Sequence, residues 1–447
     1  MRLSYGGDRM ISHSSSLFRH FTSLLALTSI ASAGLPQLNL DDADSIKQVA
    51  SRVAYDMMTF YTGNHTGDVP GNLPPPYYWW EVGGMFGALI NYYYYTGDKT
   101  YNDVVTQGMI FQSGPDHDYM TPNQTKTTGN DDQGFWAMAA MAAAEQGFPD
   151  PPEGQPGWLA LAQATFNTQA YRWDDQFCNG GLRWQVFTFN NGYNYKNTIS
   201  NGVFFNLAAR LAVYTGNDSY AQWAEKVYNW EANSGFMTPQ YNFYDGAHTD
   251  KNCTDVNKVQ WTYNVGVMML GAANMYNYTN GSSTWGGRVE GMVQGASIFF
   301  SPPRTTSSYL SRWMAATTKM APFTYDTIKP LLRASAQAAV SQCTGGQSGT
   351  MCGMIWTNNG VWDGTTGVGQ QMSVLETVQT NLIQQAKAPF TNKTGGTSKG
   401  NPGGGGQTSA DPTQDASPIG TKDRAGAGIL TTLVLIWLLG GLWWMVA

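Results

Sequence analysis

Charged side chains are scarce in this sequence. Lys, Arg, Asp and Glu make up only 13% of its 447 residues, and the net charge at neutral pH is −6. A surface that binds nucleic acid needs clustered Lys and Arg to neutralise phosphates. The composition, with a pI near 5.3, therefore argues against a nucleic-acid partner.

Stretches in which apolar and polar residues alternate are also missing. Such alternation is the pattern of a half-buried β-strand, so we expect no substantial sheet. The length allows two or three average domains, or one large one.

Histidine and cysteine are few. Neither the five histidines nor the four cysteines show the spacing of metal ligands, and we expect no metal and no other cofactor. In a secreted chain, which the N-terminus described below predicts, four cysteines form two disulfides with three possible connectivities. The first choice pairs Cys343 with Cys352 across a Gly-rich loop, which leaves Cys178 to pair with Cys253.

Aromatic residues, in contrast, are plentiful. The 16 Trp and 24 Tyr exceed what a hydrophobic core requires. Their rings can stack on the faces of neutral sugars, and the low charge around them suits such a ligand better than a phosphate.

The N-terminus has the features of a secretory signal peptide. Basic residues precede an apolar run over 21–30, and Ala31-Ser32-Ala33 then offers an A-x-A cleavage site. We predict a signal peptide over residues 1–33. Seven sequons agree with passage through the secretory pathway, and their predicted glycosylation sites are Asn64, Asn123, Asn217, Asn252, Asn277, Asn280 and Asn392.

The C-terminus carries a second apolar run, over residues 429–447. This run is just long enough to span a membrane as an anchor. No basic residue follows it, and small residues and a polar spacer precede it, which is the order of a GPI-attachment signal. We predict a GPI anchor rather than a transmembrane helix, with a flexible Gly/Ser/Thr-rich linker and attachment region over 391–425 and a signal tail over 426–447. The protein would then reside on the outer face of the plasma membrane.

Between these ends the chain alternates between two kinds of helical stretch. Segments such as 77–96, 201–217 and 263–279 are apolar on nearly every face. Each is followed by an amphipathic stretch that has a single apolar face. The crowded segments recur at intervals typical of internal repeats, and two of them end in Tyr-Thr-Gly. This pattern predicts an all-α fold, an (α/α)6 barrel of about six helical hairpins over residues 34–390. An open α-solenoid is the alternative.

One crowded segment begins with two neighbouring acids. Residues 129–134 read Gly-Asn-Asp-Asp-Gln-Gly and lead into a run of Ala and Met. The plain interpretation is that Asn130 or Asp131 caps the helix, where carboxylates favour the positive end of its dipole. A cap needs only one carboxylate, however, and two carboxyls with different pKa values are what a glycoside hydrolase uses. Asp131 and Asp132 are therefore the candidate catalytic residues.

The loops that enter the inner helices of an (α/α)6 barrel open at one end, so residues at these helix starts share one mouth. Trp and Tyr there can stack on sugars, while Asn, Gln and Glu can bind hydroxyls. For each aromatic residue the alternative is core packing, and for the glutamate it is a helix cap or an ion pair. The candidates for substrate binding are Trp79, Trp80, Glu81, Asn201, Trp261, Tyr263, Asn264 and Gln371.

The Asn-Asp-Asp-Gln motif before a small-residue helix resembles the signature of glycoside hydrolase family 76, the endo-α-1,6-mannanases. Segments 189–201 and 260–264 are similar to its fungal GPI-anchored branch, the defective-in-filamentous-growth and defective-cell-wall proteins. The likeness covers residues 41–385. It implies an (α/α)6 barrel and retaining cleavage of α-1,6-mannosidic bonds, with Asp131 as the nucleophile and Asp132 as the general acid/base.

The resemblance also implies a place and a task. The branch belongs to the cell wall and is thought to act on the mannose core of GPI glycans, passing anchored proteins to wall β-glucan. We therefore expect a monomeric transglycosidase whose donor is a GPI-core glycan or α-1,6-mannan and whose acceptor is β-glucan. A hydrolytic mannan endo-1,6-α-mannosidase and a non-catalytic mannan-binding wall protein are the alternatives.

Overall fold

The computed structural model describes residues 34–300 and 308–406, together with 431, 432, 434, 435 and 437. The predicted signal peptide and most of the predicted GPI signal tail lie outside these residues. Within the part that the structure describes, no helix is both long enough and apolar enough to cross a membrane.

The described chain is mostly helical. Its α-helices are α1 (Ala43–Met58), α2 (Trp79–Thr96), α3 (Asn102–Phe111), α4 (Asn130–Gln146), α5 (Trp158–Tyr171), α6 (Thr198–Thr215), α7 (Asp218–Asn233), α8 (Thr262–Tyr278), α9 (Ser283–Gly295), α10 (Ser308–Met320), α11 (Tyr325–Ser341) and α12 (Val368–Gln379). Short 3-10 helices are η1 (Pro122–Gln124), η2 (Thr249–Lys251), η3 (Ala296–Phe299), η4 (Pro322–Thr324) and η5 (Thr380–Leu382). Strands β1 (Tyr195–Asn197), β2 (Gly246–His248) and β3 (Val256–Asn257) form a small antiparallel sheet in that order.

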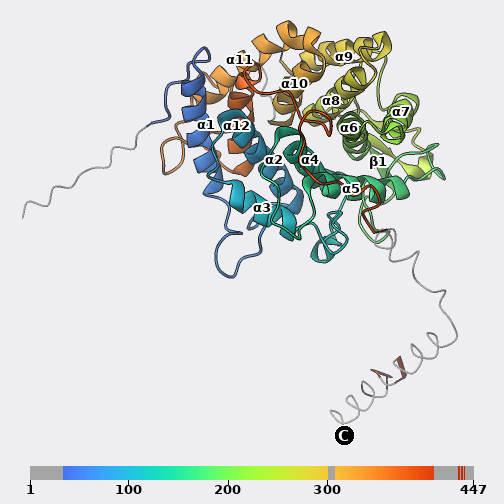
Figure 1. Ribbon diagram of the computed structural model, residues 1–447. Helices are drawn as coiled ribbons and strands as arrows, with labels where there is room; N and C mark the ends of the chain where they lie inside the picture. Colours follow the sequence, from blue (N-terminus) through green and yellow to red (C-terminus); the bar gives the residue numbers. More distant parts are fainter. Residues whose placement is uncertain (1–33, 301–307, 407–430, 433, 436, 438–447) are drawn as a thin grey trace, which may run out of the picture. The chain divides into compact units, whose positions relative to one another are not determined.

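The even-numbered helices form a closed inner ring. Each of α2, α4, α6, α8, α10 and α12 packs against the next, and α12 packs against α2 to close the ring. Outside them, α3, α5, α7 and α9 each pack against the inner helix that precedes them, α11 packs against α10 and α12, and α1 packs against α12 (Figure 1). The predicted (α/α)6 barrel is confirmed, and the closing contact excludes the open solenoid.

The sequence pattern explains this division of helices. In α2 and α6 nearly every face is buried, whereas α1 and α7 bury only one. The Tyr-Thr-Gly endings work as helix stops, because Gly97 and Gly216 adopt left-handed backbone conformations with φ of 77° and 71°. The inner helices therefore begin at one end of the barrel, where the catalytic motif lies, and stop at the other. We call these the catalytic end and the closed end.

Both predicted disulfides are present. Cys343 is bonded to Cys352, and Cys178 is bonded to Cys253. The asparagines of all seven sequons are exposed, so each is within reach of a glycan-transferring enzyme. Their glycosylation stays a prediction.

The predicted flexible linker begins too early in the chain. Residues 390–406, which we call the strap, lie against the barrel through hydrogen bonds. The Phe390 amide donates to the Glu145 carbonyl (2.6 Å) and the Ala160 amide donates to the Lys399 carbonyl (3.2 Å). Asn167 Nδ2 donates to the Gly404 carbonyl (2.8 Å). A Gly-rich composition suggested a free chain, but the free polar groups of α4 and α5 hold this segment in place.

Candidate active site

The acidic motif forms the first turn of α4. Gly129 is the N-cap residue, and its amide donates to Asp132 Oδ2 (2.7 Å). The sequence placed the cap at Asn130 or Asp131, so that assignment is wrong by one or two positions. Asp132, the third residue of the helix, does satisfy a free amide at the helix start, as in a capping box. Its capping role therefore coexists with any catalytic one.

Asn130 locks the start of α4 to the loop that follows α5. Its amide donates to the Trp184 carbonyl (2.8 Å) and its Nδ2 donates to the Arg183 carbonyl (2.8 Å). Its Oδ1 accepts a hydrogen bond from Arg172 Nε (2.9 Å). These bonds fix the backbone on which both acids are mounted.

The two carboxyls share the space above Gly129. A Cβ atom at this position would lie 2.2 Å from Asp131 Oδ1 and 3.1 Å from Asp132 Oδ2. Only a glycine leaves room for both groups. Asp131 is buried, with 9% of its surface exposed, while Asp132 is partly exposed.

Burial raises the pKa of both acids. The pKa of Asp132 rises to about 6, although its bond from the Gly129 amide opposes the shift. The pKa of Asp131 rises well above its usual value, first through burial and then through the charge of Asp132, while a hydrogen bond from Asn197 opposes the rise. Two carboxyls so placed titrate as a coupled pair, and between the two titration steps the pair retains one proton.

Aromatic side chains surround the pair. Tyr263 lies near enough to Asp131 for the carboxylate charge to raise its pKa, in addition to burial. The Trp261 ring is stacked on that of Tyr263, with centroids 6.2 Å apart, and 47% of Trp261 is exposed. Trp261 Nε1 donates to Asp245 Oδ1 (3.0 Å), and the Tyr195 hydroxyl donates to Asp245 Oδ2 (2.7 Å). The result is a rigid aromatic wall with hydrogen-bonding groups at its edge.

Two clefts open beside this wall. The first, about 630 Å³, is lined by residues that include Trp184, Tyr195, Asp245, His248 and Asn257. The second, about 490 Å³, is lined by residues that include Trp80, Glu81, Trp261, Tyr309 and Gln370. The bond between Trp261 and Asp245 joins the two clefts. The site therefore has room for sugar rings on more than one side.

Four of the eight predicted binding residues belong to the site. Trp80, Glu81 and Trp261 line the second cleft, and Tyr263 stands beside Asp131. The capping alternative for Glu81 also holds, because its Oε2 accepts from the Tyr78 amide (2.6 Å). Burial raises the pKa of this carboxyl.

The other four predicted residues line neither cleft, because their side chains are buried in the structure. Trp79 stacks on Trp136 in the core, with ring centroids 5.3 Å apart. Asn201 holds the Leu182 amide and carbonyl, and Gln371 holds those of Cys352. Asn264 is fully buried and reaches the Tyr244 carbonyl. On a helix the next residue points about 100° away, which is why Gln370 rather than Gln371 faces the cleft.

Several site residues escaped prediction from the sequence. Trp184, Tyr195 and Asp245 come from long loops and the small sheet. The sequence predictions were restricted to the starts of helices and therefore did not include them. Tyr309 comes from α10, and nothing in its sequence neighbourhood distinguished it from a core residue.

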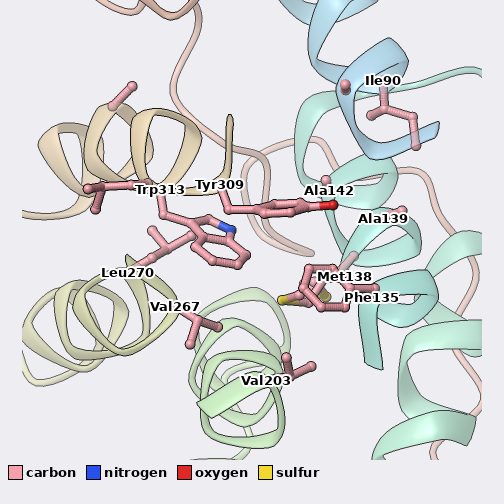
Figure 2. Packing of buried hydrophobic residues seen from close by; sticks show 14 of the residues in the cluster. Ile90, Phe135, Met138, Ala139, Ala142, Val203, Val267, Leu270, Tyr309 and Trp313 are labelled. Atoms are coloured by element: carbon pink, nitrogen blue, oxygen red, sulfur yellow. The ribbon is translucent and has the colours of Figure 1, made fainter. Parts of the chain in front are cut away.

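A layer of aromatic rings closes the barrel beneath the mouth. Phe135 lies 5.0 Å from both Trp80 and Tyr309, and Tyr309 lies 5.5 Å from Trp313, measured between ring centroids. Figure 2 shows Tyr309 and Trp313 reaching from α10 toward Phe135 on α4. Sugar rings entering from the mouth would therefore meet this layer as a floor.

Comparison with known proteins agrees with this geometry. The model of glycosyl hydrolase family 76 matches residues 45–393. The chain belongs to glycoside hydrolase family 76. It is a glycoside hydrolase, and the family resemblance stated from its motifs is confirmed.

Family 76 relatives match over most of the chain. The mannan endo-1,6-alpha-mannosidase DCW1 of Eremothecium gossypii is 43% identical over 438 residues, covering 93% of this chain and 96% of the relative. The mannan endo-1,6-alpha-mannosidase DFG5 of Saccharomyces cerevisiae is 41% identical over 429 residues, covering 91% and 93%. These similarities confirm the fungal branch of the family.

Solved family 76 structures share the fold. The crystal structure of Dfg5 from Chaetomium thermophilum in complex with glucosamine is 46% identical, with a TM-score of 0.77, and the match covers 81% of this chain and 96% of that one. The GH76A alpha-1,6-mannanase from Salegentibacter sp. HEL1_6 is 18% identical, with a TM-score of 0.58, covering 76% and 99%. The second likeness supports the fold alone.

Proposed function

We propose that this protein is a retaining α-1,6-mannosidase of the cell wall that works mainly as a transglycosidase. The observation that carries the proposal is the pair of neighbouring carboxyls, Asp131 and Asp132, at the start of α4, whose pKa values are raised by burial and which lie near two clefts lined by aromatic residues. The names of its relatives, mannan endo-1,6-alpha-mannosidases, support the α-1,6-mannosidic bond as the bond that is cleaved.

The proposed reaction has two steps. Asp131 attacks the anomeric carbon while Asp132 gives its proton to the leaving oxygen, which yields a mannosyl ester on Asp131. Asp132, now ionised, takes a proton from an incoming hydroxyl, and that oxygen displaces Asp131. The net configuration at the anomeric carbon is retained.

Substrate binding would supply the charge state that these roles need. A leaving oxygen that accepts a hydrogen bond from Asp132 favours the protonated form of that carboxyl. The single proton would then reside on Asp132, leaving Asp131 ionised near the positive end of α4 and beside Asn197.

Two clefts favour transfer to a sugar over transfer to water. We propose that one cleft holds a GPI-core glycan or α-1,6-mannan as the donor and that the other holds β-glucan as the acceptor. The C-terminal signal would attach the protein by a GPI anchor to the outer face of the plasma membrane, close to both. Since one chain closes the whole ring, a monomer suffices.

A defined α-1,6-mannoside or GPI-core glycan, incubated with a β-glucan oligosaccharide, tests the proposal. Mass spectrometry should find mannosyl–glucan products that Asp131→Asn and Asp132→Asn variants do not form. With azide, an Asp132→Ala variant should give a mannosyl azide of retained configuration and an Asp131→Ala variant one of inverted configuration, and the opposite pattern would exchange the two roles. Products formed only by transfer to water, with no mannosyl–glucan among them, would favour a hydrolytic mannanase. Binding without any product would favour a non-catalytic mannan-binding protein.

A further inference from the structure

Exposed large apolar side chains are concentrated at the catalytic end. Among the described residues between 34 and 406, all of them except Tyr55 and Phe323 lie in the segments that lead from an outer helix into the next inner helix, or, for Phe111 and Tyr171, at the last residue of an outer helix. Only some of the set line the two clefts, so sugar binding does not explain the exposure of the rest. The set includes Met354, Ile355 and Val361, which lie in one loop between α11 and α12.

The loop over residues 354–361, which we call the apolar loop, is held in a fixed shape. Asp363 Oδ2 accepts hydrogen bonds from the amides of Met354 and Ile355, both at 2.8 Å. Despite this fixed backbone, Ile355 and Val361 are 48% and 59% exposed. Neither of the two lines a cleft. The loop therefore displays apolar side chains rigidly to its surroundings.

The strap brings the end of the described chain to the same end of the barrel. It meets α5 near the first residues of that helix, where Ser398 Oγ accepts from the Leu159 amide (2.9 Å), and passes Asn167 in its last turn. It finishes at Gly406, which makes a backbone hydrogen bond to the Asp118 carboxylate. Since outer helices run from the closed end to the catalytic end, the chain leaves the barrel beside the mouth.

This exit point matters because the remaining chain is short. Residues 407–428 separate the strap from the apolar C-terminal run, and a GPI attachment residue within this stretch would make the tether shorter still. A random coil of 22 residues spans roughly 25 Å. An inner helix such as α2 is also about 27 Å long. If the chain left the barrel from the closed end, the length of the barrel alone would equal the span of the tether, and the mouth would be held away from the membrane. Because the chain leaves from the catalytic end, the mouth stays close to the anchor.

We infer that the catalytic end of the barrel faces the lipid surface to which the C-terminus attaches, with the apolar loop, which carries no sequon, in the headgroup region. The inference rests on the membrane attachment proposed above. The large hydrophobic side chains that the apolar loop exposes are aliphatic, so they suit a zwitterionic phosphatidylcholine surface that has no net charge. A glycan rising from that surface would enter the clefts directly.

A single label tests the contact. All four cysteines are paired, so an Ile355→Cys variant of the full chain offers one thiol for a fluorophore. In vesicles of brominated phosphatidylcholine, the label at 355 should be quenched. A matched label from Phe323→Cys, at the closed end, should not be. Equal quenching at both positions, none at 355, or protection of 355 by soluble β-glucan in place of vesicles would overturn the inference.

Turnover gives a second test. In an Ile355→Asp/Val361→Asp variant, turnover of a mannoside glycolipid embedded in phosphatidylcholine vesicles should fall about tenfold or more, because two buried apolar groups are lost. Turnover of a soluble α-1,6-mannoside should not change. No loss on vesicles, or an equal loss on both substrates, would overturn the inference. If the wild type turned over neither substrate, the proposed function would fail, and the quenching result would still decide the membrane contact.

Discussion

At the scale of single residues, Gly129 decides where both acids can lie. Its hydrogen leaves the space into which the carboxyls of Asp131 and Asp132 project, while its amide holds Asp132. Shifts of about 1 Å in a catalytic group can cost a hundredfold in rate. The glycine therefore contributes to catalysis without touching substrate.

A Gly129→Ala variant should lose about a hundredfold in kcat/KM, because the new Cβ would displace both carboxyls. Its melting temperature should fall by only a few degrees, since a single cap is affected. Gly287→Ala is the matched control. Nothing lies within 4 Å of its added methyl on α9, so activity should be unchanged. Full activity of Gly129→Ala would show that the carboxyl positions are not critical.

The shared proton sets the pH range of the enzyme. Both pKa values are raised, so at low pH both acids are protonated and no nucleophile exists. In the free enzyme kcat/KM should rise as the first proton leaves near pH 6, the value to which burial brings Asp132. It should fall at a higher pH, when the pair loses its second proton and no acid remains.

A pH profile of kcat/KM on a soluble α-1,6-mannoside checks this expectation, with thermal unfolding followed over the same range as the control. A profile that stays flat through pH 6 while the protein remains folded would contradict a pair with raised pKa values.

At the scale of elements, the strap shows how polar contacts turn a Gly-rich segment into part of the domain. Asn167 donates to both the Pro402 and Gly404 carbonyls, at 2.9 and 2.8 Å. The Asn401 amide donates to Gln163 Oε1 (2.7 Å). Since α5 supplies these bonds, a change on that helix should loosen the strap without touching the active site.

An Asn167→Ala variant should exchange the amide hydrogens of residues 401–406 faster than the wild type, because two anchoring bonds are lost. Global stability should fall by about 1 kcal/mol or slightly more. Turnover of a soluble mannoside should be unchanged. Asn229→Ala on α7 is the control, since its side chain makes only a weak 3.4 Å bond to Glu225. Unchanged exchange in the strap would mean that other contacts hold it.

At the scale of the whole molecule, an ion pair and hydrogen bonds connect α12, the last inner helix, to α10 and to α2, where the ring closes. Glu376 on α12 accepts from Asn91 on α2 (2.9 Å) and pairs with Arg312 on α10 (2.8 Å). Gln379 on α12 also donates to the Ala88 carbonyl (3.2 Å). Removing one partner of a buried ion pair leaves the other uncompensated.

A Glu376→Ala variant should lose about 3 kcal/mol of unfolding free energy, because Arg312 would remain buried without its partner. The urea midpoint measures this loss. Lys251→Ala, which breaks the exposed pair with Asp255, is the control and should not move the midpoint. Equal midpoints for both variants would show that the ring closure does not depend on this contact.

Patterns that repeat along the chain were sufficient to predict the barrel and the helix stops at Gly97 and Gly216, and the cysteine spacing was sufficient to predict both disulfides. Features that depend on helix rotation were not. Gln370 and Gln371 are residues of the same type, and only the orientation of the helix places Gln371 in the core and Gln370 in the cleft. The small sheet was missed because its strands span two or three residues, too few to show an alternating pattern. The ordered strap was missed because its partners lie far away in sequence, on α4, α5 and α6.

The contact between α12 and α2 has a consequence for biosynthesis. The second cleft takes walls from both of these helices, which are almost three hundred residues apart. A nascent chain that has not yet reached α12 lacks one side of its substrate groove, however well the eleven α-helices before it have folded. Activity should therefore switch on late in synthesis and all at once, with no competent shorter form.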